Sequence, residues 1–162
     1  MRQYFLLVGF MLIAPASLGS GDRAVCESAT QSSVSDYRRV PLEGELLRIQ
    51  TLFKYDPTTA FGDFDGDGRT DVALLLERVD SKVTRAISVC LSTRQGKPPV
   101  LIESLYVNGE IHVTKKGTPY HDFETGKDSV YLSDGITVAC CECCGATYMY
   151  KENQFTRVVD GD

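Results

Sequence analysis

The sequence contains no tryptophan and only two histidines, and its basic residues are fewer than its acidic ones. With 17 Lys plus Arg against 22 Asp plus Glu, the net charge is -5, so no overall basic field attracts a phosphate backbone. We therefore expect no nucleic-acid partner. Neither His112 nor His121 belongs to a nucleophile motif or a zinc-protease motif. We predict no catalytic residues, no organic cofactor and a protein that is not an enzyme.

Long hydrophobic runs are also absent, apart from one near the N-terminus. Arg2, the apolar stretch from Tyr4 to Ala14 and the small residues after it have the order of a secretory signal peptide. The stretch holds roughly 11 strongly apolar residues, fewer than the ~20 that a membrane-spanning helix needs. We predict a signal peptide over residues 1–21, a secreted protein (periplasmic or extracellular) and no membrane span in the mature chain.

All six cysteines lie beyond this segment. They are Cys26, Cys90, Cys140, Cys141, Cys143 and Cys144. An oxidising compartment favours disulfides, and bonds between immediate neighbours are strained. We therefore predict disulfides that include at least one bond from Cys26 or Cys90 to the 140–144 cluster. The alternative is a soft-metal site for copper(I) or zinc at Cys140–Cys144, because thiolates suit these ions.

Changes in hydrophobic period divide the rest of the chain. Residues 22–40 are polar and Ser-rich without apolar periodicity, which predicts a flexible polar arm. Within 41–54, Leu42, Leu46, Ile49 and Phe53 recur at helical offsets and predict a short amphipathic helix. Residues 41–162 are long enough for one hydrophobic core, so we predict a single β-rich domain there.

Beyond residue 72 the period of the apolar residues becomes two, as in a strand. Val83, Ile87, Val89 and Leu91 fall on one face of a predicted strand that has one strongly buried side. Roughly eight short strands follow the helix, and Asn108–Gly109 predicts a tight hairpin between two of them. The sequence therefore predicts an α+β fold with one short N-terminal helix and a mainly antiparallel β-sheet.

The chemically informative segment is the acidic stretch FGDFDGDGRTD at 61–71. Asp63, Asp65 and Asp67 occupy alternate positions, and Asp71 closes a nine-residue loop. Carboxylate oxygens, together with glycine for a sharp turn, are what calcium requires. Four carboxylates so close together also need a compensating cation. We predict a calcium site formed by the carboxylates of Asp63, Asp65, Asp67 and Asp71 and by the backbone carbonyl of Arg69.

This loop is not an EF-hand, because its twelfth position is Leu74 rather than a bidentate glutamate. With Phe61–Gly62 before the aspartates and Asp71–Ala73 closing the loop, residues 61–92 resemble the calcium loop and strands of FG-GAP and VCBS repeats. Such repeats occur in integrin-type propellers and in many exported bacterial proteins. A propeller needs at least ~4 blades, and this chain has one good copy, so we expect no complete propeller. The resemblance implies calcium binding and supplies no enzymatic activity.

Together these features predict an exported, non-catalytic calcium-binding domain whose partner is another protein or a cell-surface macromolecule. One alternative is a periplasmic inhibitor or immunity-type protein against a toxin or a cell-wall enzyme, since small size, export and the lack of catalytic motifs permit that role. A second alternative is a soft-metal or redox protein that uses Cys140–Cys144.

Overall fold

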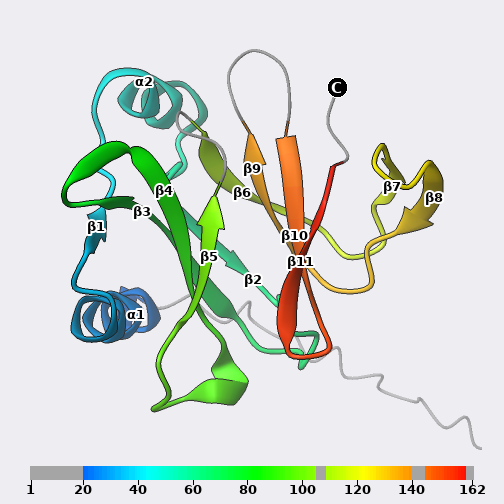
Figure 1. The fold of residues 1–162 in the computed structure, drawn as a ribbon, viewed down its shortest axis with the longest axis horizontal. Coiled ribbons are helices and arrows are strands. Elements are labelled where there is room, and N and C mark those ends of the chain that lie inside the picture. Colours follow the sequence, from blue (N-terminus) through cyan, green and yellow to red (C-terminus); the bar gives the residue numbers. More distant parts are fainter. Residues whose placement is uncertain (1–19, 105–108, 140–144, 160–162) are drawn as a thin grey trace, which may run out of the picture.

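The computed structural model describes residues 20–104, 109–139 and 145–159. Within these ranges the chain forms two α-helices and eleven strands, and the strands pair antiparallel (Figure 1). In chain order the elements are α1 (Ser20–Ser33), β1 (Tyr37–Arg39), α2 (Gly44–Phe53), β2 (Thr59–Gly62), β3 (Asp71–Arg78), β4 (Ser81–Cys90), the 3-10 helix η1 (Ser92–Arg94), β5 (Val100–Ser104), β6 (Glu110–Thr114), β7 (Pro119–Asp122), β8 (Lys127–Val130), β9 (Gly135–Ala139), β10 (Gly145–Lys151) and β11 (Gln154–Val158). The predicted α+β fold is confirmed, with more strands than the eight expected.

The strands form two main sheets and one small hairpin. The first sheet has the order β1-β3-β4-β5, with β2 also paired to β3, and the second has the order β11-β10-β9-β6. Strands β7 and β8 pair with each other. The main core contains residues from both sheets, among them Ile87 and Val89 of β4, Ile111 of β6, and Ile136 and Val138 of β9. The described strands close neither a barrel nor a propeller.

Helix α1 lies against the first sheet (Figure 1), where the sequence predicted a flexible arm. Cys26 is 1% exposed and forms a disulfide with Cys90 at the end of β4, with Cα atoms 5.8 Å apart. One turn further along the helix, the Thr30 hydroxyl lies 2.7 Å from that of Ser88. The prediction of an arm over 22–40 was wrong because these two buried contacts and the ion pairs of Arg23 and Glu27, rather than an apolar stripe, hold the helix.

The docked helix also buries the second face of β4. Ile87 and Val89 face the main core, as their alternation predicted. Ala86 and Ser88, on the opposite face, are nevertheless 0% exposed. A second core lies there, and it consists of Cys26, Val72, Leu74, Leu76 and Ala86. The sequence predicted one strongly buried side of β4, and the helix accounts for the other.

The predicted bond from Cys26 or Cys90 to the 140–144 cluster is wrong, because these two cysteines are bonded to each other. Docking of α1 places Cys26 over the end of β4, which brings together positions 64 residues apart in the sequence. Residues 140–144 lie outside the described residues, and so does the alternative soft-metal site at Cys140–Cys144.

Helix α2 confirms the helix predicted over 41–54, but its apolar stripe packs only in part. Leu46 packs on the main core, whereas Leu52 is 59% and Phe53 67% exposed. Lys54, which directly follows the last residue of the helix, has a left-handed φ of 60°. No helix in the described part of the chain is long and apolar enough to cross a membrane.

Gly109, the described half of the predicted Asn108–Gly109 turn, lies close to β9. Strand β5 pairs with β4 in the first sheet, whereas β6 pairs with β9 in the second. A Cβ atom on Gly109 would lie 2.7 Å from Val138 Cγ1 and 2.8 Å from the carbonyl oxygen of Ala139. Glycine is therefore needed where the chain approaches β9 closely. Asn108 lies outside the described residues.

The carboxylate of Asp56 joins α1, β1 and β2 through charged contacts. It lies 2.9 Å from Arg23 Nη1 and 3.6 Å from Arg39 Nη2. The hydroxyls of Thr58 and Thr59 donate hydrogen bonds to it at 2.7 and 3.0 Å. Burial disfavours the charged form, but the threonine hydrogen bonds and Arg39 outweigh burial and hold the pKa of Asp56 below its usual value.

We predict that Asp56→Asn lowers the free energy of unfolding at neutral pH by about 1.5–3 kcal/mol, the range for hydrogen bonds to charged groups. Because the folded pKa lies below the unfolded one, this stabilisation is fully present above about pH 4 and is lost as the pH falls through the folded value. Urea unfolding at several pH values measures the difference between wild type and variant. A difference that stays constant down to about pH 2 would contradict the assignment. Asp128→Asn is the matched control, because its carboxylate is 90% exposed.

Candidate metal centre

The acidic loop between β2 and β3 is closed at its base by strand pairing. Gly62 at the end of β2 pairs with Asp71 at the start of β3, so the two ends of the loop lie side by side. Gly66 and Gly68 have φ values of +78° and +84°, which residues with a Cβ rarely adopt. Phe64 is 0% exposed and packs in the main core. The glycines and the buried ring give the loop a defined, tightly turned path.

Three of the predicted ligands converge in this loop. Asp63, Asp65 and Asp71 each offer a carboxylate oxygen, and these oxygens all lie within 4.8 Å of one another. Asp71 is 1% exposed. The Oδ1 atom of Asp63 is buried and has no hydrogen-bond partner among the described residues. A buried carboxylate oxygen without a partner is costly unless a donor or a cation satisfies it. The donor set therefore fits a hard cation.

The environment of the Asp71 carboxylate also favours a bound cation. Burial raises the pKa of Asp71 to about 6, and the nearby charge of Asp65 adds to the increase. The backbone N–H groups of Ser92 and Phe64 oppose it, since they donate to the carboxylate at 2.7 and 2.8 Å. A bound cation would favour the ionised form and remove the repulsion between carboxylates.

Asp67 and Arg69, the other two predicted ligands, lie outside this group of three. Asp67 accepts a hydrogen bond from the Ser92 hydroxyl at 2.8 Å and one from the Arg69 backbone N–H at 2.7 Å. The hydrogen bond from the Ser92 hydroxyl is the largest influence and lowers the pKa of Asp67 below its usual value; burial opposes it, and the Arg69 N–H adds to the lowering. The loop therefore has a convergent part and an exposed part that contacts the β4–β5 connection.

Ser92 and Thr93, which the sequence analysis did not select, support the carboxylates from outside the loop. The Thr93 hydroxyl donates to Asp65 Oδ2 at 2.5 Å, and Ser92 contacts both Asp67 and Asp71. These contacts span 21 to 28 residues. Hydroxyl residues after a strand are common, so no local signal distinguishes them. Their placement follows from the pairing of β3 with β4.

Asp134, also missed, fixes the loop to the segment before β9. Its backbone N–H donates to the Asp63 carbonyl at 3.1 Å, and its Oδ2 accepts from the Asp63 N–H at 3.2 Å. Lys115 lies 2.7 Å from the same oxygen and compensates its charge. A Cβ on Gly62 would meet Phe64 Cε1 at 2.7 Å and Asp134 Oδ2 at 3.1 Å. The residue before the first aspartate must therefore be small.

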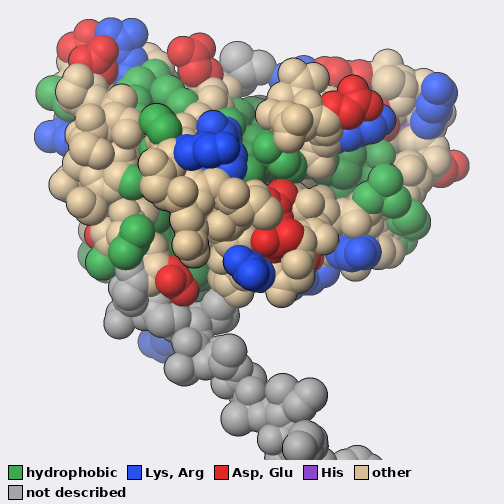
Figure 2. Space-filling view, turned by 90° about the horizontal axis from the view of Figure 1, so that it is seen from below, with side chains coloured by type: hydrophobic (Ala, Val, Ile, Leu, Met, Phe, Trp, Pro, Cys, Tyr) green, Lys and Arg blue, Asp and Glu red, His purple; other side chains and the backbone are tan. Residues whose placement is uncertain are grey.

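The histidines lie elsewhere in the fold. His112 is half-buried on β6, and His121 is exposed on β7 with its Nδ1 2.8 Å from Asp128 Oδ1. Figure 2, which views the molecule from the lower end of Figure 1, shows acidic side chains gathered near the middle of this face with basic ones around them. This face presents carboxylates to solvent, where a cation can reach them.

Comparisons with protein-family models, curated proteins and solved structures found no match.

Proposed function

We propose that the loop at 63–71 binds calcium and that the protein is an exported, non-catalytic module that binds another protein or a cell-surface macromolecule. The observation that carries the metal assignment is the buried, unpartnered Oδ1 of Asp63 beside the carboxylates of Asp65 and Asp71. The resemblance of 61–92 to FG-GAP and VCBS repeats supports calcium over other hard cations. Coordination chemistry also supports calcium, because calcium accepts six to eight oxygen ligands in adaptable geometry, whereas magnesium demands a near-ideal octahedron.

The ion would be held by Asp63, Asp65 and Asp71, with Asp67 and the carbonyl of Arg69 as the remaining proposed ligands. Its chemistry here is charge compensation, because it neutralises aspartates that repel one another. Asp71 begins β3, whose residues 71–77 are buried, so holding its carboxylate fixes where the strand starts. A one-residue slip there would exchange the two faces of β3. The proposed role of the ion is therefore structural, and the face it orders is available for a partner.

We predict that calcium raises the melting temperature. For a Kd of ~0.1 to 1 mM, as in extracellular modules, about 1 mM calcium stabilises by roughly 0.4 to 1.4 kcal/mol. Each kcal/mol corresponds to about 2–4 °C at this size. Thermal unfolding of metal-free protein, with and without calcium, measures the shift.

Asp65→Asn should abolish the shift, because it removes a charge while keeping the acceptor for the Thr93 hydroxyl. Asp128→Asn makes the same charge change at a carboxylate that is 90% exposed, and it should leave the shift intact. Equal melting curves in excess chelator and in several millimolar calcium would refute calcium binding. Turnover of a substrate that Asp71→Asn abolishes without loss of stability would refute the non-catalytic role.

A further inference from the structure

A pocket of about 120 Å³ lies beside the disulfide, between α1, the ends of β3 and β4, and the segment 92–99. Its buried lining is apolar and includes Val72, Val89 and Leu91 together with the Cys26–Cys90 bond. Pro98 and Pro99 belong to the outer wall, and proline limits the conformations that this segment can adopt. The pocket is therefore a small apolar recess with a comparatively stiff outer edge.

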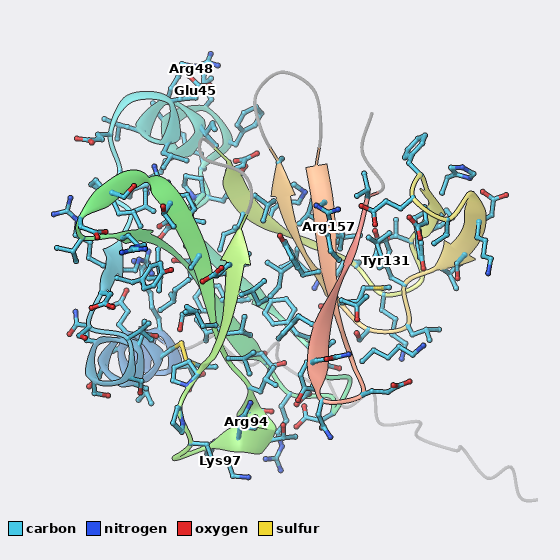
Figure 3. The ribbon with its side chains drawn as sticks, viewed as in Figure 1. Glu45, Arg48, Arg94, Lys97, Tyr131 and Arg157 are labelled. Carbon is cyan, nitrogen blue, oxygen red and sulfur yellow. A yellow bond between two sulfur atoms is a disulfide. The ribbon has the colours of Figure 1, made fainter. Side chains whose placement is uncertain are left out.

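Two cations line the same recess. Arg94 at the end of η1 and Lys97 three residues later lie on the connection between β4 and β5 (Figure 3). Arg94 is half-buried and Lys97 exposed, and neither has an ion-pair partner among the described residues. Several other arginines among the described residues pair with carboxylates, as Arg39 does with Glu27. Asp22 at the start of α1 also lines the pocket, so its charged lining, Arg94 and Lys97 against Asp22, has a net charge of +1. In a protein with a net charge of -5, a net positive lining with two cations that have no ion-pair partner favours an anionic group on the ligand.

We propose that this pocket binds the C-terminal residue of a peptide that ends in a small aliphatic side chain. The side chain would enter the recess, and the terminal carboxylate would pair with Arg94 and Lys97. A guanidinium matches a carboxylate in charge and in its two-pronged geometry. The volume limits the apolar part, since an apolar cavity of about 150 Å³ is known to hold one benzene ring. At about 120 Å³ the recess suits a valine or leucine side chain better than a larger ring. This proposal rests on the proposed binding role and names the ligand class.

The pocket is physically linked to the candidate metal centre. Ser92 and Thr93, which directly precede Arg94, donate hydrogen bonds to Asp67 and Asp65. The backbone N–H of Ser92 donates to Asp71. A cation that fixes these carboxylates would also fix the start of the segment that carries both pocket cations. Peptide affinity is therefore expected to rise when calcium is present.

The test uses a fluorescent peptide that ends in valine, with a free carboxylate, and the C-terminal amide of the same peptide. Fluorescence polarisation with the purified protein measures both affinities in calcium and in chelator. The free acid should bind about 10-fold more tightly than the amide, the ratio expected for losing one charge-assisted contact. A peptide of the same sequence that ends in tryptophan should bind more weakly, because the indole exceeds the recess.

Variants of the pocket separate the contribution of its cations from that of its apolar recess. Arg94→Gln should weaken binding of the free acid about 10-fold and leave binding of the amide unchanged. Ala29→Leu, which adds volume at a lining residue, should weaken the acid and the amide together. Lys127→Gln makes the same charge change as Arg94→Gln on β8 and should change neither affinity. Melting curves confirm that each variant is folded.

Equal affinities for acid and amide, or an Arg94→Gln variant that binds like wild type, would overturn the proposal. No peptide binding by a protein that still shows the calcium-dependent melting shift would overturn the pocket assignment and leave the metal site standing. Peptide binding that persists unchanged in chelator, with no melting shift, would instead refute the calcium site and its link to the pocket. The two failures are therefore distinguishable.

Discussion

Removal of the Cys26–Cys90 disulfide is expected to lower the free energy of unfolding by about 4 kcal/mol. The bond closes a loop across a sequence separation of 64, and in the chain-entropy model a crosslink over this length stabilises by that amount. The bond also holds α1 over the second core, which contains Val72, Leu74 and Leu76. Without it, this apolar face of the first sheet would be covered only by a helix that has few other buried contacts.

The measurement is urea unfolding of a Cys26→Ala/Cys90→Ala double variant, which leaves the four other cysteines untouched. Thr30→Ala is the matched control, since it removes the other buried contact of α1, the hydrogen bond to Ser88, and keeps the disulfide. It should cost only about 1 kcal/mol. If the double variant lost no more stability than Thr30→Ala, the covalent bond would not be what secures the helix. Alkylation of denatured, unreduced protein should also leave both cysteines unlabelled.

The sequence predicted the elements whose residues repeat with a regular period. The alternation through Ile87 and Val89 indicated a strand with a core-facing side, and the structure confirms that side. Helix α1 was missed because period arguments detect apolar stripes, whereas α1 is held by Cys26 and Thr30. These two positions are four residues apart and share a helical face, which is the signal that could have indicated the helix.

Local spacing likewise predicted only the local part of the candidate site. The alternate aspartates bring Asp63 and Asp65 together, and strand pairing adds Asp71. Asp134, which lies 71 residues from Asp63, enters through the packing of the two sheets and has no counterpart in the loop motif. Spacing also suggested Asp67 as an equal partner, whereas in the structure its carboxylate binds Ser92 and the Arg69 N–H. Tertiary contacts therefore divide the aspartates into a convergent group and an exposed one.

Phe64→Ala is expected to cost about 3–5 kcal/mol and also to abolish the calcium-dependent rise in melting temperature. Phe64 is 0% exposed in the main core, and truncating a buried phenylalanine removes its transfer free energy and leaves a cavity. Its neighbours in the sequence, Asp63 and Asp65, converge with Asp71 on the candidate metal centre. Its own backbone N–H donates to Asp71 Oδ2 at 2.8 Å. The buried ring thus positions the residues on both sides of it, so losing the ring should displace the carboxylates.

Phe64→Leu separates anchoring from simple loss of stability. Leucine keeps most of the apolar volume, so we expect a cost below about 1.5 kcal/mol and a calcium-dependent shift close to that of wild type. Phe123→Ala, at an exposed ring on the β7–β8 turn, should cost less than about 1 kcal/mol and leave the shift intact. The measurements are urea unfolding in chelator and thermal unfolding with and without calcium. A folded Phe64→Ala variant with a full calcium shift would show that the strand pairing of Gly62 with Asp71 is sufficient to place the carboxylates, and that the ring contributes only to the core.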